Sequence, residues 1–201
     1  MTLYLFTKRI FDIVTASIAL ALLFPLFVLI GFAVKMDSPG KVFFLQKRVG
    51  HYGKVFSMFK FRTMYTGSDK KGLLTIGDED HRITRSGKFL RRYKLDELPQ
   101  LINVLAGNMS LVGPRPEVQQ YVDLYNAEQK KVLQAKPGIT DPVSLQYFNE
   151  NELMSRYADP EEGYVKEVMP EKLRLNLEYL EHRSFYSDLR ILLMTIARIF
   201  S

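Results

Sequence analysis

The longest feature of the hydrophobic pattern is a nearly uninterrupted apolar run from Ile10 to Val34. It is long enough to enter a bilayer and has no small-residue cleavage site, so we expect it to remain in the protein as a membrane anchor. Pro25 interrupts its helical hydrogen-bond ladder, and basic residues flank both ends, with Lys8 and Arg9 before the run and Lys35 after it.

Two topologies remain open for this anchor. A re-entrant helix, kinked at Pro25, would leave through the face by which it entered and keep both basic ends in the cytoplasm. A kinked helix that crosses the membrane is the alternative, because proline is tolerated in membrane helices. In both cases we expect residues 1–36 to form the anchor and residues 37–201 to form one compact cytoplasmic domain.

Two stretches of β-prone residues, 42–46 and 55–63, predict a β-hairpin after the anchor. In its second strand Lys60 and Arg62 fall on the same face, and two neighbouring cations suit a diphosphate. A solvated strand face is the alternative interpretation. The polar, glycine-rich stretch from Tyr65 to Lys88 predicts a long surface loop.

Two adjacent carboxylates, Asp96 and Glu97, begin a helical pattern of apolar residues that continues to Leu105. They follow a basic run that consists of Lys88, Arg91, Arg92 and Lys94. Asp96 is a good N-cap residue, so we place it at the positive end of the helix, where it stays ionised and a phosphate can dock. Because adjacent side chains point in different directions, one carboxylate can attack while the other holds a metal. An N-cap and a first-turn acid without chemistry are the alternative.

One arginine is bracketed by prolines in Gly113-Pro114-Arg115-Pro116. The prolines restrict the backbone, so the Arg115 guanidinium is held at low entropic cost and matches a pair of phosphate oxygens.

The C-terminal third predicts two helices, one around Leu173 to Leu180 and one from Phe185 to Phe200. Arg190 and Arg198 lie on the otherwise apolar second helix, which fits either the membrane interface or packing on the core. With the hairpin, these helices predict a helix-rich α+β fold with amphipathic interfacial helices.

The composition limits the catalytic groups, partners and metals that this chain can use. The chain has 47% hydrophobic residues, a net charge of +6 and no cysteine, which excludes disulfides and thiolate catalysis. The positive charge favours an anionic partner: nucleic acid, a phospholipid surface or a phosphorylated small molecule. The three scattered histidines favour a hard, oxygen-bound metal over a histidine site.

Several motifs, in this order, resemble the bacterial sugar transferase family and its small monotopic phosphoglycosyl transferases. They are Lys8-Arg9-x-Phe11-Asp12, Gln46-x-Arg48-x-Gly50-x-x-Gly53-x-x-Phe56, Lys60-Phe61-Arg62-Thr63-Met64, Leu95-Asp96-Glu97-Leu98-Pro99-Gln100, Gly113-Pro114-Arg115-Pro116 and Pro137-Gly138-Ile139-Thr140. Ordered motifs together are far more specific than any one of them.

This resemblance implies an enzyme of the bacterial inner membrane, with a re-entrant anchor and a catalytic domain on the cytoplasmic face. Such an enzyme moves a sugar-1-phosphate from a UDP-sugar to polyprenyl (undecaprenyl) phosphate with Mg²⁺, yields UMP, and takes the first membrane step of surface glycan or exopolysaccharide assembly. The resemblance makes Asp96 the nucleophile and Glu97 the acid that serves the metal. We assign Lys60, Arg62, Arg92 and Arg115 to substrate phosphates.

Two departures from the family pattern concern the anchor and the region after Thr140. The chain has Phe24-Pro25 where the family often has Ser-Pro, and residues 141–152 differ from the usual run, so the sugar is not transferred from relatives. A non-enzymatic, membrane-anchored binder of anionic lipid or nucleic acid is the contrasting hypothesis. It gives no reason for adjacent acids among cations, so we favour the enzyme and expect no nucleic-acid partner.

Overall fold

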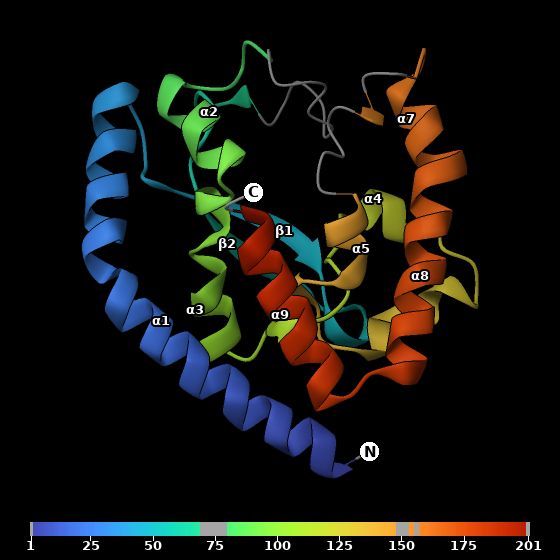
Figure 1. Cartoon of the computed structure of the whole chain (residues 1–201). Helices are drawn as coiled ribbons and strands as arrows, with labels where there is room; N and C mark the ends of the chain where they lie inside the picture. Colours follow the sequence, from blue (N-terminus) through green and yellow to red (C-terminus); the bar gives the residue numbers. More distant parts are fainter. Residues whose placement is uncertain (1, 69–79, 148–152, 155–156, 200–201) are drawn as a thin grey trace.

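The computed structural model describes residues 2–68, 80–147, 153–154 and 157–199, and it has a helix-rich α+β fold (Figure 1). In chain order its helices and strands are α1 (Thr2–Asp37), β1 (Phe43–Val49), β2 (Val55–Phe61), α2 (Arg85–Arg92), α3 (Gln100–Leu105), β3 (Ser110–Val112), α4 (Gln119–Val122), β4 (Gly138–Thr140), α5 (Pro142–Gln146), α7 (Pro160–Gly163), α8 (Met169–His182) and α9 (Phe185–Ile199). Three 3₁₀ turns and a π-helical turn add His51–Gly53, Leu95–Glu97, Gln129–Gln134 and Tyr164–Val168. The predicted helix-rich α+β class, with a β-hairpin and one long apolar N-terminal helix, is confirmed.

Helix α1 runs along one side of the molecule and bends on the way (Figure 1). Pro25 lies inside the helix, and a proline is the usual cause of such a bend. Among the described residues, α1 is the one helix that is long and apolar enough to cross a membrane. Its inner face is buried, whereas its outer face exposes large apolar side chains, among them Leu3, Leu22, Phe24, Phe32 and Met36.

The amino-terminal arm of α1 is fastened to the domain by polar side chains. Arg9 donates hydrogen bonds to two carbonyl oxygens at the end of α3. The Asp12 carboxylate, only 2% exposed, accepts hydrogen bonds from the Ser110 hydroxyl at 2.8 Å and the Leu111 N–H at 3.1 Å. The start of α1 is therefore bound to α3 and β3.

A second polar cluster joins the start of α1 to the C-terminal helices. The Asp188 carboxylate on α9 accepts hydrogen bonds from the Tyr4 hydroxyl at 2.8 Å, the Lys8 ammonium at 2.6 Å and the Tyr179 hydroxyl at 2.6 Å. We call Tyr4, Lys8, Tyr179 and Asp188 the Asp188 cluster.

The carboxyl end of α1 is held by Arg62, which overturns one sequence-based prediction. Its guanidinium donates to the Ser38 hydroxyl at 2.6 Å, and the side chain also donates to the backbone carbonyl oxygens of Val34, Ser38, Pro39 and Lys41. Strand β2 ends at Phe61, so the strand alternation that paired Arg62 with Lys60 no longer applies. The prediction that both cations project together toward a diphosphate is wrong, because Arg62 closes the end of α1 instead.

The hairpin and α2 form the next part of the fold. Strands β1 and β2 pair antiparallel as predicted, with Phe43 opposite Phe61. Helix α2 begins at Arg85, inside the stretch that was predicted to be a loop, and the Thr84 hydroxyl caps it by accepting from the Gly87 N–H. Residues 69–79 of that predicted loop lie outside the described residues.

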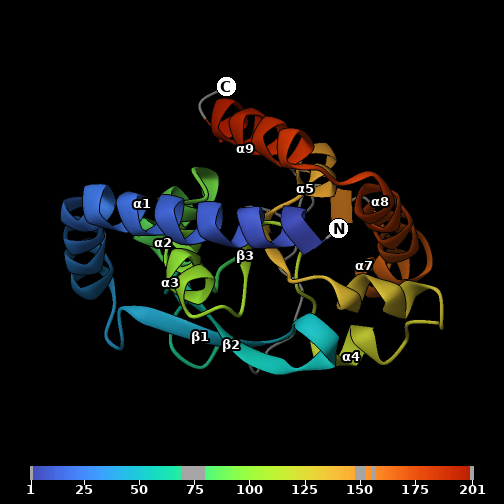
Figure 2. The same cartoon turned by 90° about the horizontal axis from the view of Figure 1, so that it is seen from below.

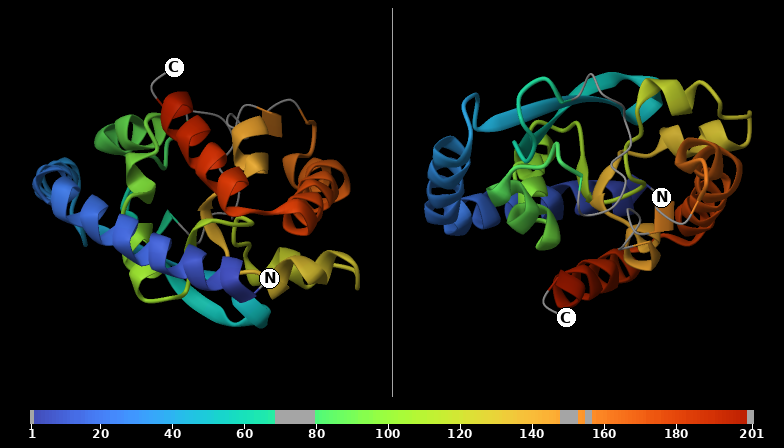
Figure 3. Two further views of the ribbon diagram at one scale, coloured as in Figure 1. Left: turned by 60° about the horizontal axis from the view of Figure 1, so that its bottom comes forward. Right: turned by 90° about the horizontal axis from the view of Figure 1, so that it is seen from above.

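The remaining elements complete three layers. Helices α1 and α9 lie on one side and the hairpin on the other, with α3 between them (Figure 2). Strands β3 and β4 pair in parallel and contact α9. Helix α8 lies on the side of the molecule opposite the carboxyl end of α1 (Figure 3). Helix α9 packs on the core through Ile191 and exposes Tyr186, Leu193 and Ile196, so its location at a membrane interface stays a prediction.

Candidate active site

A cavity of about 940 Å³ contains most of the predicted site residues. Its volume is near the upper end of the roughly 300–1,000 Å³ that is usual for small-molecule sites. Five predicted residues line it together: Lys60, Arg92, Asp96, Glu97 and Arg115. Further cations in the lining are Arg48, Lys88, Arg91, Lys94 and Lys172, so the cavity suits an anionic ligand.

The acid pair lies in a 3₁₀ turn, Leu95–Glu97, and not at a helix N-cap as predicted. Helix α3 starts later, at Gln100, and Pro99 precedes it without a side-chain cap. The turn is preceded by Lys94 in the left-handed conformation, with φ of 54°. With this backbone conformation the Asp96 side chain is buried. Burial, and not a helix N-terminus, is therefore the main influence on the pKa of its carboxyl group.

Glu97 is held by two cations. Its carboxylate accepts a hydrogen bond from the Lys60 ammonium at 2.9 Å and is bound through both oxygens by the Arg115 guanidinium. Burial alone would raise the pKa of Glu97, but Arg115 and Lys60 hold it well below its usual value. Glu97 is therefore a fixed negative charge.

Asp96 differs from its neighbour. It is 6% exposed, and within the described residues its side chain forms no hydrogen bond or ion pair. Burial raises the pKa of the Asp96 carboxyl; the Lys60 ammonium opposes this shift, and the Glu97 carboxylate adds to it. The expectation that a helix N-terminus keeps Asp96 ionised is thus corrected, because nearby cations are what favour its charged form.

Arg91 on helix α2 interacts electrostatically with the acid pair, although it was not among the predicted phosphate ligands. Arg91 is half-buried and donates from Nε to the Thr63 hydroxyl at 2.9 Å. Burial lowers the pKa of its guanidinium, and the Asp96 carboxylate opposes that shift. Arg92, the predicted phosphate ligand, is exposed at the cavity rim and lies 5.8 Å from the Tyr93 ring centre. Arg91 is therefore a better electrostatic partner for Asp96 than Arg92 is.

The cavity residues fit a magnesium ion only if the substrate supplies part of its oxygen ligands. No group of three or more acidic or histidine side chains that could hold a metal occurs in the described part of the chain. Magnesium, however, is often bound by one or two carboxylates together with substrate phosphates. Glu97 provides one such carboxylate, and an anionic substrate would supply further oxygen ligands.

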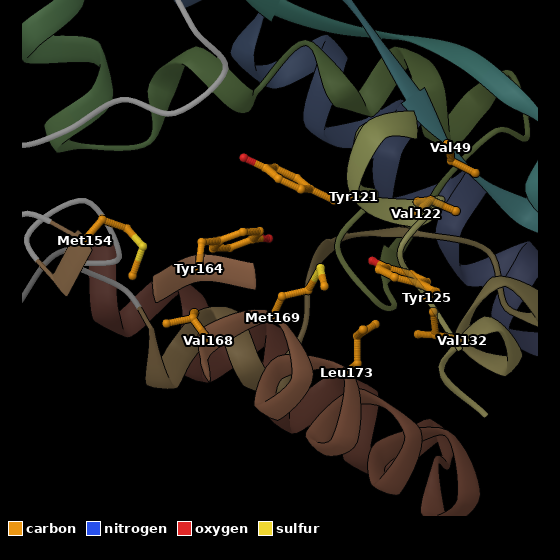
Figure 4. Close-up of a cluster of buried hydrophobic side chains, with 10 residues drawn as sticks. All are labelled: Val49, Tyr121, Val122, Tyr125, Val132, Met154, Tyr164, Val168, Met169 and Leu173. Carbon is orange, nitrogen blue, oxygen red and sulfur yellow. The ribbon is translucent and has the colours of Figure 1, made fainter. Parts of the chain in front are cut away.

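A second wall of the cavity was not anticipated from the sequence. It comes from α4, the π-helical turn and α8, and it carries Tyr121, Tyr164, Lys172 and Asn176. Figure 4 shows Tyr121 and Tyr164 facing each other, and their ring centres are 4.9 Å apart. These residues lie in stretches without a motif, and only the fold brings them near Asp96.

Comparison with known proteins identifies relatives along nearly the whole chain. The family described as “Bacterial sugar transferase” matches residues 3–201. A UDP-glucose:undecaprenyl-phosphate glucose-1-phosphate transferase of Xanthomonas campestris pv. campestris is 40% identical over 98% of this chain. One of the same name from Caulobacter vibrioides is 36% identical over 94%. A UDP-N-acetylgalactosamine-undecaprenyl-phosphate N-acetylgalactosaminephosphotransferase of Aeromonas hydrophila is 36% identical over 98%. The chain spans 39%, 68% and 44% of the lengths of these relatives, respectively.

Proposed function

The chain belongs to the bacterial sugar transferase family, and from this premise we propose that it is an enzyme that transfers a sugar-1-phosphate from a UDP-sugar to polyprenyl phosphate. The acceptor is undecaprenyl phosphate, the substrate that the names of its relatives give. The products are polyprenyl-diphosphate-sugar and UMP, and the reaction takes the first membrane step of surface glycan assembly.

One observation carries this proposal: Asp96 is a buried carboxylate that has no hydrogen-bonding partner among the described residues, beside an acid that two cations neutralise. A buried carboxylate that serves only the fold is normally hydrogen-bonded. A nucleophile, in contrast, needs free lone pairs and cations nearby that favour its charged form. Asp96 meets both needs.

The reaction has two balanced steps. An Asp96 oxygen attacks the phosphorus that bears the sugar, the bond to the UMP oxygen breaks, and UMP leaves with the electron pair. An oxygen of polyprenyl phosphate then attacks the same phosphorus and releases the Asp96 carboxylate. Because the aspartyl phosphosugar separates the steps, the soluble donor and the membrane-bound acceptor need not occupy the cavity together.

The cations have distinct parts in these steps. Lys60 and Arg115 line the cavity and bind Glu97, and Arg91 of α2 lines it too and interacts electrostatically with Asp96. Fixed positive charges of this kind stabilise the equatorial oxygens of a transferring phosphoryl group. When bound, magnesium held by Glu97 offsets the charge of the phosphates.

Trapping of the covalent species tests the proposal. Incubation of wild-type enzyme with UDP-sugars, without acceptor, is expected to release UMP and add one phosphosugar to the peptide containing Asp96, seen by mass spectrometry. A panel of UDP-sugars identifies the donor. UMP release without any such adduct would disprove the covalent route, whereas absence of UMP release with every donor and acceptor would disprove the activity.

A re-entrant anchor is the second part of the proposal, and the contacts of α1 support it. Arg9 and Asp12 near one end and Asp37 at the other all bind the same domain. A helix that crossed the membrane would have to pull Arg9 and Asp12 away from α3 and β3. The domain then lies at the inner, cytoplasmic face of the bacterial membrane, where UDP-sugars are available, with the apolar outer faces of α1 and α9 toward lipid.

Labelling from each side of the membrane tests this topology, because the chain has no native cysteine. We choose Thr2→Cys, at the start of α1, and Lys41→Cys, whose side chain is exposed. Ser38 is unsuitable, because it is buried against Arg62. An impermeant maleimide is expected to label neither variant in intact spheroplasts and both in inverted vesicles. Labelling of Thr2→Cys from outside would show a crossing helix instead.

A further inference from the structure

Arg115 reaches Glu97 from a short segment whose backbone is fixed on both sides. On its amino side, the Gly113 N–H donates to the Thr140 carbonyl oxygen at 3.0 Å, which continues the pairing of β3 with β4. The approach is so close that a Cβ on Gly113 would lie 2.4 Å from the Lys136 carbonyl oxygen. The backbone before Arg115 is therefore held by the parallel strand pair.

The carboxyl side of Arg115 is held by an ion pair at the end of the hairpin. Arg48 on β1 donates from Nη1 to the Pro116 carbonyl oxygen at 3.2 Å and to the Glu117 carboxylate at 2.8 Å. The Val49 N–H donates to the Glu117 carbonyl oxygen at 2.8 Å. One guanidinium thus binds both the backbone and a side chain of the two residues that follow Arg115.

Tyr164 connects this ion pair to the C-terminal part of the fold. Its hydroxyl donates to the second carboxylate oxygen of Glu117 at 2.5 Å, and it comes from the π-helical turn that leads into α8. Such turns are frequent at functional sites. The two carboxylate oxygens of Glu117 are therefore bound by side chains from separate parts of the molecule, β1 and the π-helical turn.

The position of this group of residues suggests more than a role in folding. Arg48, Glu117 and Tyr164 line the same cavity as Arg115 and Glu97. Arg115 binds both oxygens of Glu97, and such a two-pronged pair depends strictly on the placement of the guanidinium. Ion pairs withdrawn from water add little net stability to a fold, but they can select one conformation. The conformation selected here is that of the segment carrying Arg115.

We infer that Arg48, Glu117 and Tyr164 are positioning residues, which hold Arg115 in the geometry in which it binds Glu97. They act through Arg115 and need no contact with the substrate. The inference rests on the proposed function, in which Arg115 stabilises the phosphates. It makes the rate of transfer depend on the π-helical turn, which none of the sequence motifs includes.

Tyr164→Phe tests the inference, because it removes the hydroxyl that donates to Glu117 and keeps the ring that packs 4.9 Å from the Tyr121 ring. We expect kcat per folded enzyme to fall about three- to tenfold, which is part of the contribution of one hydrogen bond to a charged group. Tyr157→Phe is the matched control. The Tyr157 hydroxyl also donates to a glutamate, Glu167, at 2.9 Å, but neither residue lines the cavity.

A double-mutant cycle with Arg115→Met separates positioning from a general structural role. If Tyr164 acts through Arg115, Tyr164→Phe is expected to change kcat by less than about twofold once the guanidinium is absent. A general structural role predicts the same fall in both backgrounds. Equal factors in the two backgrounds, or an unchanged kcat in Tyr164→Phe alone, would overturn the inference.

Hydrogen exchange measures the positioning without turnover. The Val118 N–H donates to the same Glu117 carboxylate at 2.7 Å. Residues 113–118 are therefore expected to exchange faster in Tyr164→Phe than in wild type or Tyr157→Phe. Equal exchange in all three proteins would also overturn the inference. If wild type releases UMP from no UDP-sugar, the proposed function fails, and the exchange of residues 113–118 still decides whether Tyr164 positions this segment.

Discussion

Two buried aspartates, in different regions of the molecule, show how one residue type serves fold and chemistry. Asp188, 4% exposed, accepts hydrogen bonds from Tyr4, Lys8 and Tyr179 and joins α1 to α8 and α9. Asp96, 6% exposed, has no such bond within the described residues, although cations surround it. Burial alone does not distinguish them. A carboxylate whose hydrogen bonds are all made supports the structure, whereas one that is left open can react.

The largest expected effect is at the open carboxylate. Asp96→Asn removes the attacking charge but breaks no hydrogen bond, so we expect kcat to fall by more than about 10³-fold with little change in the unfolding midpoint. UMP release and thermal unfolding in detergent measure the two quantities. Asp123→Asn, at an exposed position, is the control. Turnover at the normal rate in Asp96→Asn would remove this residue from the reaction.

Glu97 combines features of both aspartates, since it is fully paired and yet lies in the cavity. Glu97→Gln leaves Lys60 and Arg115 without their counter-charge and replaces a hard ligand by an amide. We expect kcat to fall by roughly 10²-fold and the magnesium concentration for half-maximal rate to rise. Rates at a series of free Mg²⁺ concentrations measure both. Full wild-type activity in excess EDTA would exclude the metal from the proposal.

For Asp188, whose hydrogen bonds are all made, we expect an effect on stability and not on turnover. Asp188→Asn removes the charge partner of Lys8 in a buried cluster, so we expect a loss of about 3 kcal/mol in the free energy of unfolding. The turnover of the molecules that remain folded is expected to stay within a few-fold. Thermal unfolding together with kcat per folded enzyme provides the check. A large fall in kcat at an unchanged midpoint would contradict the structural role of Asp188.

The smallest expected effect is a shift in the pH dependence of kcat/KM. Because burial raises the pKa of Asp96, its carboxylate takes up a proton at a higher pH than an ordinary aspartate, and kcat/KM is expected to fall as pH falls through that value. Lys60 lowers this pKa, so Lys60→Met is expected to move the acid limb to higher pH, whatever its effect on the plateau. Lys54→Met, in the exposed hairpin turn, is the control. An acid limb that shifts to lower pH in Lys60→Met would reverse the assigned interaction.

Local patterns predicted much of the fold. The apolar run gave α1, the β-prone stretches gave the hairpin, and the two C-terminal helices appeared where their periodicity placed them. Each of these elements depends on residues that are near one another in the sequence. Helix α2 was missed because its sequence, Arg85 to Arg92, is mostly polar, and because its start is set by the Thr84 cap.

The site was predicted less completely, for two physical reasons. Motifs identified Asp96 and Glu97, but the turn that follows left-handed Lys94 could not be read from helical spacing. The partners of a long side chain are set by tertiary packing. Arg62 bonds to the end of α1, and its guanidinium passes Gly40, where a Cβ would lie 3.5 Å from it. Alternation along a strand cannot indicate such a partner.

The attachment of α1 also sets an order of events during synthesis. Asp12 finds its partner 98 residues later, and Lys8 finds Asp188 180 residues later. At about 5–20 residues per second, the ribosome needs roughly 10 to 40 s to make the second interval. In the proposed membrane-anchored state, the apolar helix therefore meets lipid before Tyr4, Lys8 and Asp12 have all found their partners. The contact between Lys8 and Asp188 forms only when α9 has been made, so synthesis of α9 determines when both fastenings of the start of α1 are complete.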